Sequence, residues 1–309
     1  MAEKYLKALN ADPDQCRKEE LSQDLNRLRE ILFQNGVELS EDLLTKNRKG
    51  EFKEFDDFSE YRKYVLNEHL SLNEHALHCF CKNSEKDNLN IGFGTGSYHV
   101  LRNNNLSKIE RSFSRIKSEY SFARLLFYKY LKFKDDNELN YSKYYIDSDI
   151  DDLKSIGNVE SELFELEHLR TAYRISYSIL DKIARILLML YNIDEEDKHY
   201  YFENVFNHFP QLKEKENQHI YALYSMTLDL SRDKTDYKGA LKVFKDIRNK
   251  FEHDILVISQ NSSNFEDGVI NENEFVNYLK ELLKLTRASI FSVVFLVRTE
   301  TIVKLNDYP

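Results

Sequence analysis

Residues 161–191 read SELFELEHLRTAYRISYSILDKIARILLMLY, and this stretch decides the fold class. Apolar side chains recur in it at spacings of three and four, which is the period of an α-helix. Toward the end of the stretch they occupy much of the helix circumference. The pattern therefore predicts a long helix that lies at the centre of a helical bundle, because such a helix must be covered on most sides.

The segments on both sides of this helix have the same periodicity. Apolar residues three and four apart run from Leu106 to Tyr130 and predict a second long helix. Further helices are expected over residues 200–208, 218–230, 237–259 and 273–304. Because four of the helices after residue 105 are long, we predict an all-α fold built on a four-helix bundle with inserted short helices.

The N-terminal part of the chain predicts a helical extension. One helix carries apolar residues from Leu21 to Leu32, and a second begins near Asp56. We therefore divide the chain into a helical N-terminal extension, residues 1–70, and a helical bundle, residues 71–309. The extension has no convergent set of acids and bases, so we expect it to serve regulation or partner contact.

Two stretches between the expected helices read as connectors. The acidic, polar residues 135–158 predict a linker, and residues 75–100 predict an ordered loop or a short extended segment. Gly92 to Ser97 has the glycine spacing of a phosphate-cradling loop only superficially, since it lacks the G-K-[ST] ending and a preceding strand. A turn-rich connector is the better interpretation.

Composition narrows the function classes. The 309 residues carry a net charge of −9, which argues against coating nucleic acid with the whole surface but allows a local basic cleft. Three cysteines make no disulfide framework. The start of the chain lacks the apolar run of a signal peptide, and no stretch reaches the length of a membrane span. We therefore expect a cytoplasmic protein without membrane contact.

Residues 246–253 read Asp-Ile-Arg-Asn-Lys-Phe-Glu-His inside the expected helix 237–259. Arg248 falls near the edge of an apolar stripe, where a charged group needs a partner or a wet cleft. His253 lies about 140° away from it on a straight helix. The two converge if the arginine wraps, if the helix distorts, or if a second copy of the helix lies opposite. The stripe consists of Ala240, Leu241, Phe244, Ile247, Phe251, Ile255 and Ile258.

These residue types suit the cleavage of RNA, which carries its own nucleophile in the 2′-hydroxyl. Histidine exchanges protons near neutral pH. The guanidinium of arginine is permanently charged and can donate two hydrogen bonds at once to phosphate oxygens. A purely structural interpretation stays open, because Arg248 and Glu252, like Asn249 and His253, are four apart and can pair on a helix face.

The motif and its surroundings resemble the HEPN superfamily, and in particular its LA-type branch. The R-N-x-x-x-H pattern of Arg248, Asn249 and His253 is the signature of active HEPN ribonucleases. Similarity extends over about residues 70–305 and follows the order of that family. The other segments that carry it are residues 116–124, 169–173, 178–184, 222–224 and 285–289.

The resemblance implies a metal-independent endoribonuclease that needs no cofactor, acting in prokaryotic antiviral defence or toxin-type growth arrest. It implies a homodimer in which two motif helices form one composite site, with Arg248 as phosphate clamp, Asn249 as orienting group and His253 as acid and base. The substrate is RNA, with tRNA among the candidates, and a regulatory or antitoxin protein is an expected partner. Some HEPN toxins carry a tyrosine two residues past the histidine that a partner modifies; here this residue is Ile255. The alternative is a catalytically inactive bundle that serves as a dimerising or RNA-binding scaffold.

Several lesser signals remain. Glu119 and Arg124 lie on the helix expected to face the motif helix, so they either orient Arg248 and contact RNA or form a buried ion network. Asp181 and Arg185, four apart, are interpreted as an internal pair. The cluster of His75, His78, Cys79 and Cys81 has zinc-ligand types but no standard spacing, so no metal site is predicted.

Overall fold

The computed structural model describes residue 34 and residues 55–91, 105–136, 164–193, 200–231, 239, 241–259 and 263–306. The chain divides into two compact units, residues 1–63 with 75–86 and residues 64–74 with 87–309. The expected helix at Leu21–Leu32, the Gly92–Ser97 loop and nearly all of the 135–158 linker lie outside the described residues. The division into an extension and a bundle at residue 70 stays a prediction.

The described part of the smaller unit consists of short helices joined by aromatic contacts. It contains η2 (Phe55–Asp57), η3 (His75–Leu77), η4 (Lys82–Ser84) and the first residues of α4 (Glu60–Asn67). The Phe55 ring packs 6.1 Å from Phe58 and 5.7 Å from Phe80, and Arg62 Nε donates to the Ser84 carbonyl at 2.8 Å. Residues 75–91 contain η3 and η4 and no β-strand, and the rest of the expected connector, residues 92–100, lies outside the described residues.

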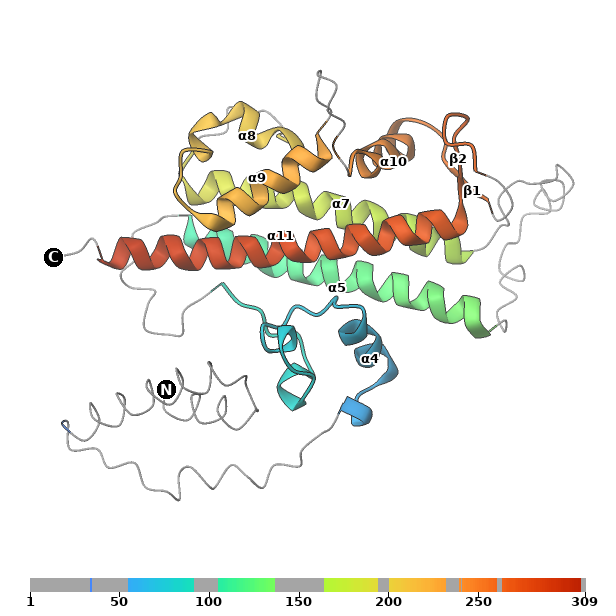
Figure 1. The fold of residues 1–309 in the computed structure, drawn as a ribbon, viewed down its shortest axis with the longest axis horizontal. Helices are drawn as coiled ribbons and strands as arrows, with labels where there is room; N and C mark the ends of the chain where they lie inside the picture. The colour runs from blue at the N-terminus through green and yellow to red at the C-terminus, as the bar shows by residue number, and fades with distance from the viewer. Residues whose placement is uncertain are drawn as a thin grey trace, which may run out of the picture. The chain divides into compact units, whose positions relative to one another are not determined.

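Three long helices form the centre of the larger unit and lie side by side (Figure 1). They are α5 (Leu106–Asp136), α7 (Phe164–Leu190) and α11 (Glu272–Asn306). Asn105, at the start of α5, donates to the carbonyl of Met189 near the end of α7 at 3.2 Å. Helices α5 and α7 are therefore antiparallel. Thr286 of α11 donates to the carbonyl of Ser176 of α7 at 3.2 Å, which joins the third helix to the same layer.

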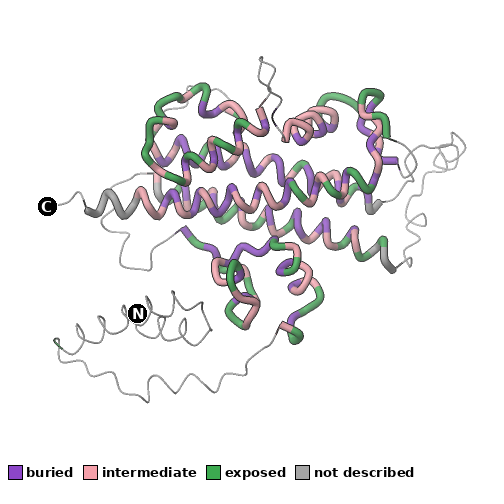
Figure 2. The backbone as a smooth tube through the Cα atoms, in the orientation of Figure 1, coloured by how far each residue is buried: buried purple, intermediate pink, exposed green. Residues whose placement is uncertain are grey.

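The central position predicted for α7 is confirmed. Its side chains are buried on several faces, and the buried segments in Figure 2 follow α7 and α11 along their contact. Tyr173, Ile183 and Leu187 are fully buried. The apolar content that predicted a central helix is thus used for packing against α5 on one side and α11 on the other.

Shorter helices flank this layer. They are η6 (Phe202–Asn204), α8 (Val205–His208), η7 (Pro210–Leu212), α9 (Gln218–Leu230) and α10 (Lys242–His253). Helix α9 begins where expected, because the Asn217 side chain accepts the His219 backbone N–H at 2.9 Å and caps the helix. The all-α prediction with inserted short helices is confirmed.

The expected helix over residues 237–259 is too long at its C-terminal end. Helix α10 ends at His253, and residues 257–259 form strand β1 (Val257–Ser259), which pairs in parallel with β2 (Val269–Asn271). Asp254 is already extended, with φ −145° and ψ −172°, and β-branched residues such as Val257 favour a strand. As a result Ile255 is 77% exposed, although the helical stripe predicted that it would be buried.

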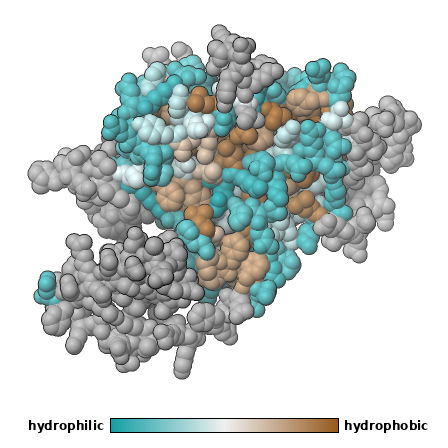
Figure 3. Space-filling view, viewed as in Figure 1, coloured by the Kyte–Doolittle hydropathy of each residue, from teal (hydrophilic) through white to brown (hydrophobic). Residues whose placement is uncertain are grey.

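Among the described helices, none combines the length and the apolar character needed to cross a membrane. On the face of the molecule shown in Figure 3, hydrophilic side chains cover most of the described helices, and smaller hydrophobic areas lie among them.

Candidate functional site

Helix α10 is held firmly against α7 and α11 by its apolar face. Phe244, Ile247 and Phe251 are buried. The Phe251 ring lies 5.7 Å from Tyr173 of α7 and 5.5 Å from Phe275 of α11. Tyr173 Oη also donates to the Phe244 carbonyl at 2.7 Å. These contacts fix the rotation of α10 and therefore decide where its polar residues lie.

Arg248 lies half-buried between two aromatic rings. Its guanidinium carbon is 5.9 Å from the ring centroid of Tyr177 on α7 and 5.4 Å from that of Tyr201, which precedes η6. A planar guanidinium at this distance from ring faces gains cation–π attraction and loses rotational freedom. Its Nη1 donates to Oδ1 of Asn249 at 3.2 Å. Two of the three predicted motif residues therefore meet in the structure.

Two carboxylates lie in the same polar region. Asp181 of α7 accepts the Phe202 backbone N–H at 2.9 Å. Glu203 accepts a hydrogen bond from Tyr177 Oη at 3.2 Å and a charged one from Lys245 of α10. Arg248 is thus a fixed cation at the edge of a hydrogen-bonded network that joins α7, η6 and α10.

The electrostatics of the network single out Asp181. Burial raises the pKa of this carboxyl to about 6, although the Phe202 N–H, the charge of Arg248 and the charge of Arg185 lower it. Burial also raises the pKa of Tyr177, and the negative charges of Glu203 and Asp181 add to the effect, so the phenol stays a neutral donor. A carboxyl that titrates near neutral pH is a group that can exchange protons under ordinary conditions.

The asparagine variant Asp181→Asn is expected to stabilise the fold at pH 7 by up to about 3 kcal/mol, the free energy of a pKa raised by about two units. The folded pKa of about 6 lies above the ordinary value of 3.8, so the wild-type protein loses stability as the pH rises from about 4 to about 6. The neutral amide has no such loss and can still accept the Phe202 N–H. Urea denaturation of both proteins between pH 4 and 7 measures the difference. A variant less stable than wild type at pH 7 would contradict this account.

His253 is the last residue of α10 and is exposed. Beside it, Arg174 of α7 donates from Nη2 to the Phe251 carbonyl at 3.1 Å and lies 4.0 Å from Glu252. Within the described part of the chain, no hydrogen bond joins Arg248 to His253. A single chain therefore presents the two motif residues in different surroundings, one between aromatic rings and one at an open helix end.

Glu119 and Arg124 have partners away from the motif. Arg124 is 4% exposed, donates from Nη1 to the Leu70 carbonyl at 2.7 Å and forms an ion pair with Asp87 at 2.8 Å. Glu119 binds Arg115 at 2.7 Å and also binds Lys182 of α7. Arg248, in contrast, contacts Tyr177 and Tyr201. These contacts favour the ion-network interpretation for both residues.

The smaller unit gathers three soft donor atoms. The ligand atoms of His75, Cys79 and Cys81 lie within 4.8 Å of one another, and His75 Nε2 is 3.0 Å from Cys81 Sγ. His78 is not part of this group. Burial raises the pKa of the Cys79 thiol, and the neighbouring Cys81 contributes to the rise. The absence of a metal site stays a prediction.

Sequence reasoning missed several residues around Arg248, namely Tyr177, Tyr201 and Glu203. They come from α7 and η6 and are distant from the motif along the chain. Asp181 was noticed, but only as an internal partner of Arg185. A stronger signal was available, because Asp181 interrupts an apolar helix that was expected to be central, where a buried carboxylate is costly unless it has partners.

The chain is thus an all-α bundle in which Arg248 lies near the titratable carboxyl of Asp181 and His253 lies at an exposed helix end. The family model of LA2681-like HEPN domains matches residues 100–300, and the chain belongs to this family. The match covers most of the 70–305 region in which the resemblance was seen. HEPN domains often bind RNA and dimerise, and the superfamily generally comprises ribonucleases. No curated protein and no solved structure matches the chain.

Proposed function

We propose that this protein is a metal-independent endoribonuclease. The observation that supports the proposal most directly is the position of Arg248. Its guanidinium lies against the rings of Tyr177 and Tyr201, and the same helix, α10, ends at the exposed His253. A fixed, permanently charged fork suits a phosphate that gains negative charge in the transition state. Family membership supplies the RNA-related context.

The reaction follows from the chemistry of RNA. The 2′-oxygen forms a bond to the adjacent phosphorus, and the bond from phosphorus to the 5′-oxygen breaks. One proton leaves the 2′-hydroxyl and one reaches the 5′-oxygen, so the products are a 2′,3′-cyclic phosphate and a 5′-hydroxyl. His253 would exchange these protons, Arg248 would stabilise the charged phosphorane, and Asn249 would orient the guanidinium through its 3.2 Å contact.

A dimer would complete the site. Because Arg248 and His253 have different surroundings in one chain, a second copy of α10 placed opposite would bring the histidine of one subunit toward the arginine of the other. Two histidines in one cleft could then act as base and acid. We therefore propose a homodimer through the motif helices, the symmetric interface that is commonest among soluble oligomers.

The biological setting that we propose is prokaryotic antiviral defence or toxin-type growth arrest. A regulatory or antitoxin protein would then control the nuclease, and residues 1–70 would provide regulation or partner contact. Ile255 stands two residues past His253, at the position where some HEPN toxins carry a modified tyrosine. Silencing by that modification is therefore not expected for this chain.

The purified protein is expected to sediment as a dimer at micromolar concentration and to cut single-stranded or tRNA-like RNA in the presence of EDTA. End analysis should detect cyclic phosphate and 5′-hydroxyl groups, because the internal 2′-oxygen is the nucleophile. A dimer that binds RNA without cutting it would instead identify a non-catalytic scaffold. Cleavage that disappears in EDTA would contradict the metal-independent mechanism.

A further inference from the structure

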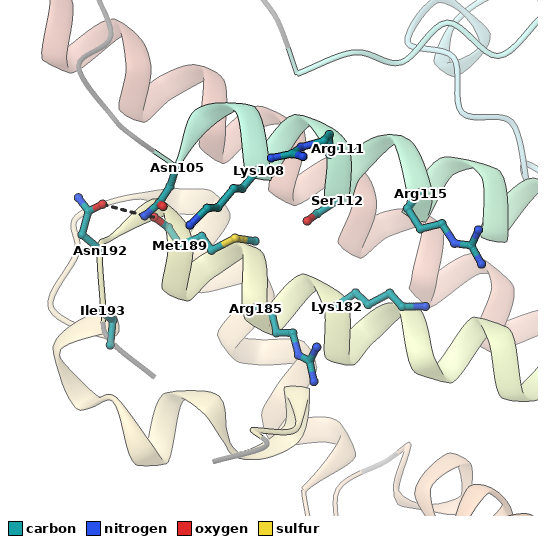
Figure 4. Close-up of a pocket in the computed structure, with 10 residues that line it drawn as sticks. All are labelled: Asn105, Lys108, Arg111, Ser112, Arg115, Lys182, Arg185, Met189, Asn192 and Ile193. Atoms are coloured by element: carbon teal, nitrogen blue, oxygen red, sulfur yellow. Dashed lines mark hydrogen bonds between the residues drawn. The ribbon is translucent and has the colours of Figure 1, made fainter. Parts of the chain in front are cut away.

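A groove with strongly basic walls runs between the start of α5 and the end of α7 (Figure 4). It has a volume of about 950 Å³, and half of its ten lining residues are lysine or arginine, while none is acidic. The chain as a whole carries a net charge of −9. The groove is therefore locally basic, although the protein as a whole is acidic. The five cations are Lys108, Arg111, Arg115, Lys182 and Arg185.

The cations come from two helices that run side by side. Lys108, Arg111 and Arg115 lie on one face of α5, at spacings of three and four, and cover about 10 Å of helix axis. Lys182 and Arg185 come from α7; in Figure 4 Lys182 extends along this helix, and Arg185 points away from α5. At one end of the groove, Asn105 joins the two helices. Its side chain donates to the Met189 carbonyl at 3.2 Å and to Asn192 Oδ1 at 3.1 Å. Three cations in line along α5 suit an elongated anion that carries more than one charge.

Only part of this charge is compensated by Glu119, which lies beside the groove. Its carboxylate binds Arg115 at 2.7 Å and binds Lys182. Although burial raises the pKa of Glu119, the hydrogen bonds and charges of Lys182 and Arg115 lower it overall, so the group is ionised at neutral pH. Arg185 also interacts with the charge of Asp181, so the cations that remain for a ligand are those along α5. Lys108 and Arg111 are exposed and can reach a ligand.

Helix α7 connects the groove to the surroundings of Arg248. It directs Tyr177 and Asp181 toward the network of Arg248, and the next residue, Lys182, lines the groove. Arg185 lies one helical turn from Asp181 and acts on its charge. A linear ligand in the groove that extends along α7 therefore reaches the candidate site within about one turn of helix.

We propose that this groove binds the sugar-phosphate backbone of single-stranded RNA and guides the strand toward Arg248. The inference rests on the proposed function and names the surface that holds its substrate. Cations placed at successive turns of α5 suit consecutive phosphates, whereas the lining residues include no aromatic ring on which a base could stack. Contacts of this kind bind the backbone without reading its sequence.

The test compares two pairs of substitutions on α5. Lys108→Ala with Arg111→Ala removes two charges from the groove. Lys129→Ala with Lys132→Ala removes two exposed charges from the far part of the same helix and is the matched control. Each full-length protein is titrated with a fluorescent 2′-O-methyl oligoribonucleotide, which cannot be cleaved, over a series of salt concentrations. Circular dichroism verifies folding.

The groove pair is expected to weaken binding and to reduce the slope of log affinity against log salt by about 1.4, since each phosphate contact on a single strand contributes about 0.7. The control pair should keep the wild-type slope. Equal slopes for wild type and the groove pair would overturn the proposal. So would ATP binding that is lost in the groove pair while RNA binding is unchanged, because this would identify a nucleotide site.

The same proteins separate this inference from the proposed function. If wild type binds RNA through the groove but does not cut an ordinary RNA strand, the groove proposal stands and the ribonuclease proposal fails. If wild type cuts RNA and the groove pair binds and cuts as wild type does, the ribonuclease proposal stands and the groove proposal fails.

Discussion

Replacing His253 by alanine is expected to slow RNA cleavage by roughly 10²- to 10⁴-fold, the usual contribution of a positioned acid or base. The imidazole is exposed at the last residue of α10, so its removal leaves no cavity and no unpaired buried group. The rate should therefore fall without a loss of folding stability or of the dimer. Single-turnover cleavage kinetics, together with sedimentation and thermal melting, measure these three quantities.

A matched control is available in His208, which is also exposed and is also the last residue of a helix, α8. His208→Ala should retain the wild-type cleavage rate. If His253→Ala cut RNA as fast as wild type, or lost activity only because it failed to fold, the acid–base role would be wrong.

Replacing Arg248 by alanine is expected to slow cleavage by roughly 10²- to 10³-fold, the range observed when one group that stabilises a developing negative charge is removed. Its charge also lowers the pKa of Asp181, so the variant should shift the titration of that carboxyl to higher pH. The pH dependence of denaturation, compared with wild type, measures this shift. It reports on the network independently of catalysis.

Two further variants separate charge from geometry. Arg248→Lys keeps the positive charge but loses the planar fork and its contact with two rings, so it should recover only part of the rate. Lys242→Ala removes a cation from the same helix, away from these rings, and should cut RNA normally. An Arg248→Ala protein in which only stability or association changes would favour the scaffold function.

Local periodicity was sufficient to predict most of the helices. Helices α7, α9 and α11 appear close to their expected bounds because their apolar spacing and, for α9, an Asn217 cap act within a few residues. The same reasoning failed at Ile255, where α10 had already ended. The strand pairing of Val257 with Val269 depends on residues beyond a loop, and a helical period contains no information about such a partner.

The sequence by itself determined the all-α class and the central place of α7, because periodicity is a local property. It also singled out Arg248, Asn249 and His253 as candidate site residues, because residue chemistry is local too. Only the tertiary structure decided what surrounds them. The rings of Tyr177 and Tyr201 and the carboxyl of Asp181 reach Arg248 from other elements, through the packing of α10 on α7. The basic groove likewise exists because two antiparallel helices bring cations that are distant in the sequence close together. Burial, which raises the pKa of Asp181, is a property of the folded chain alone.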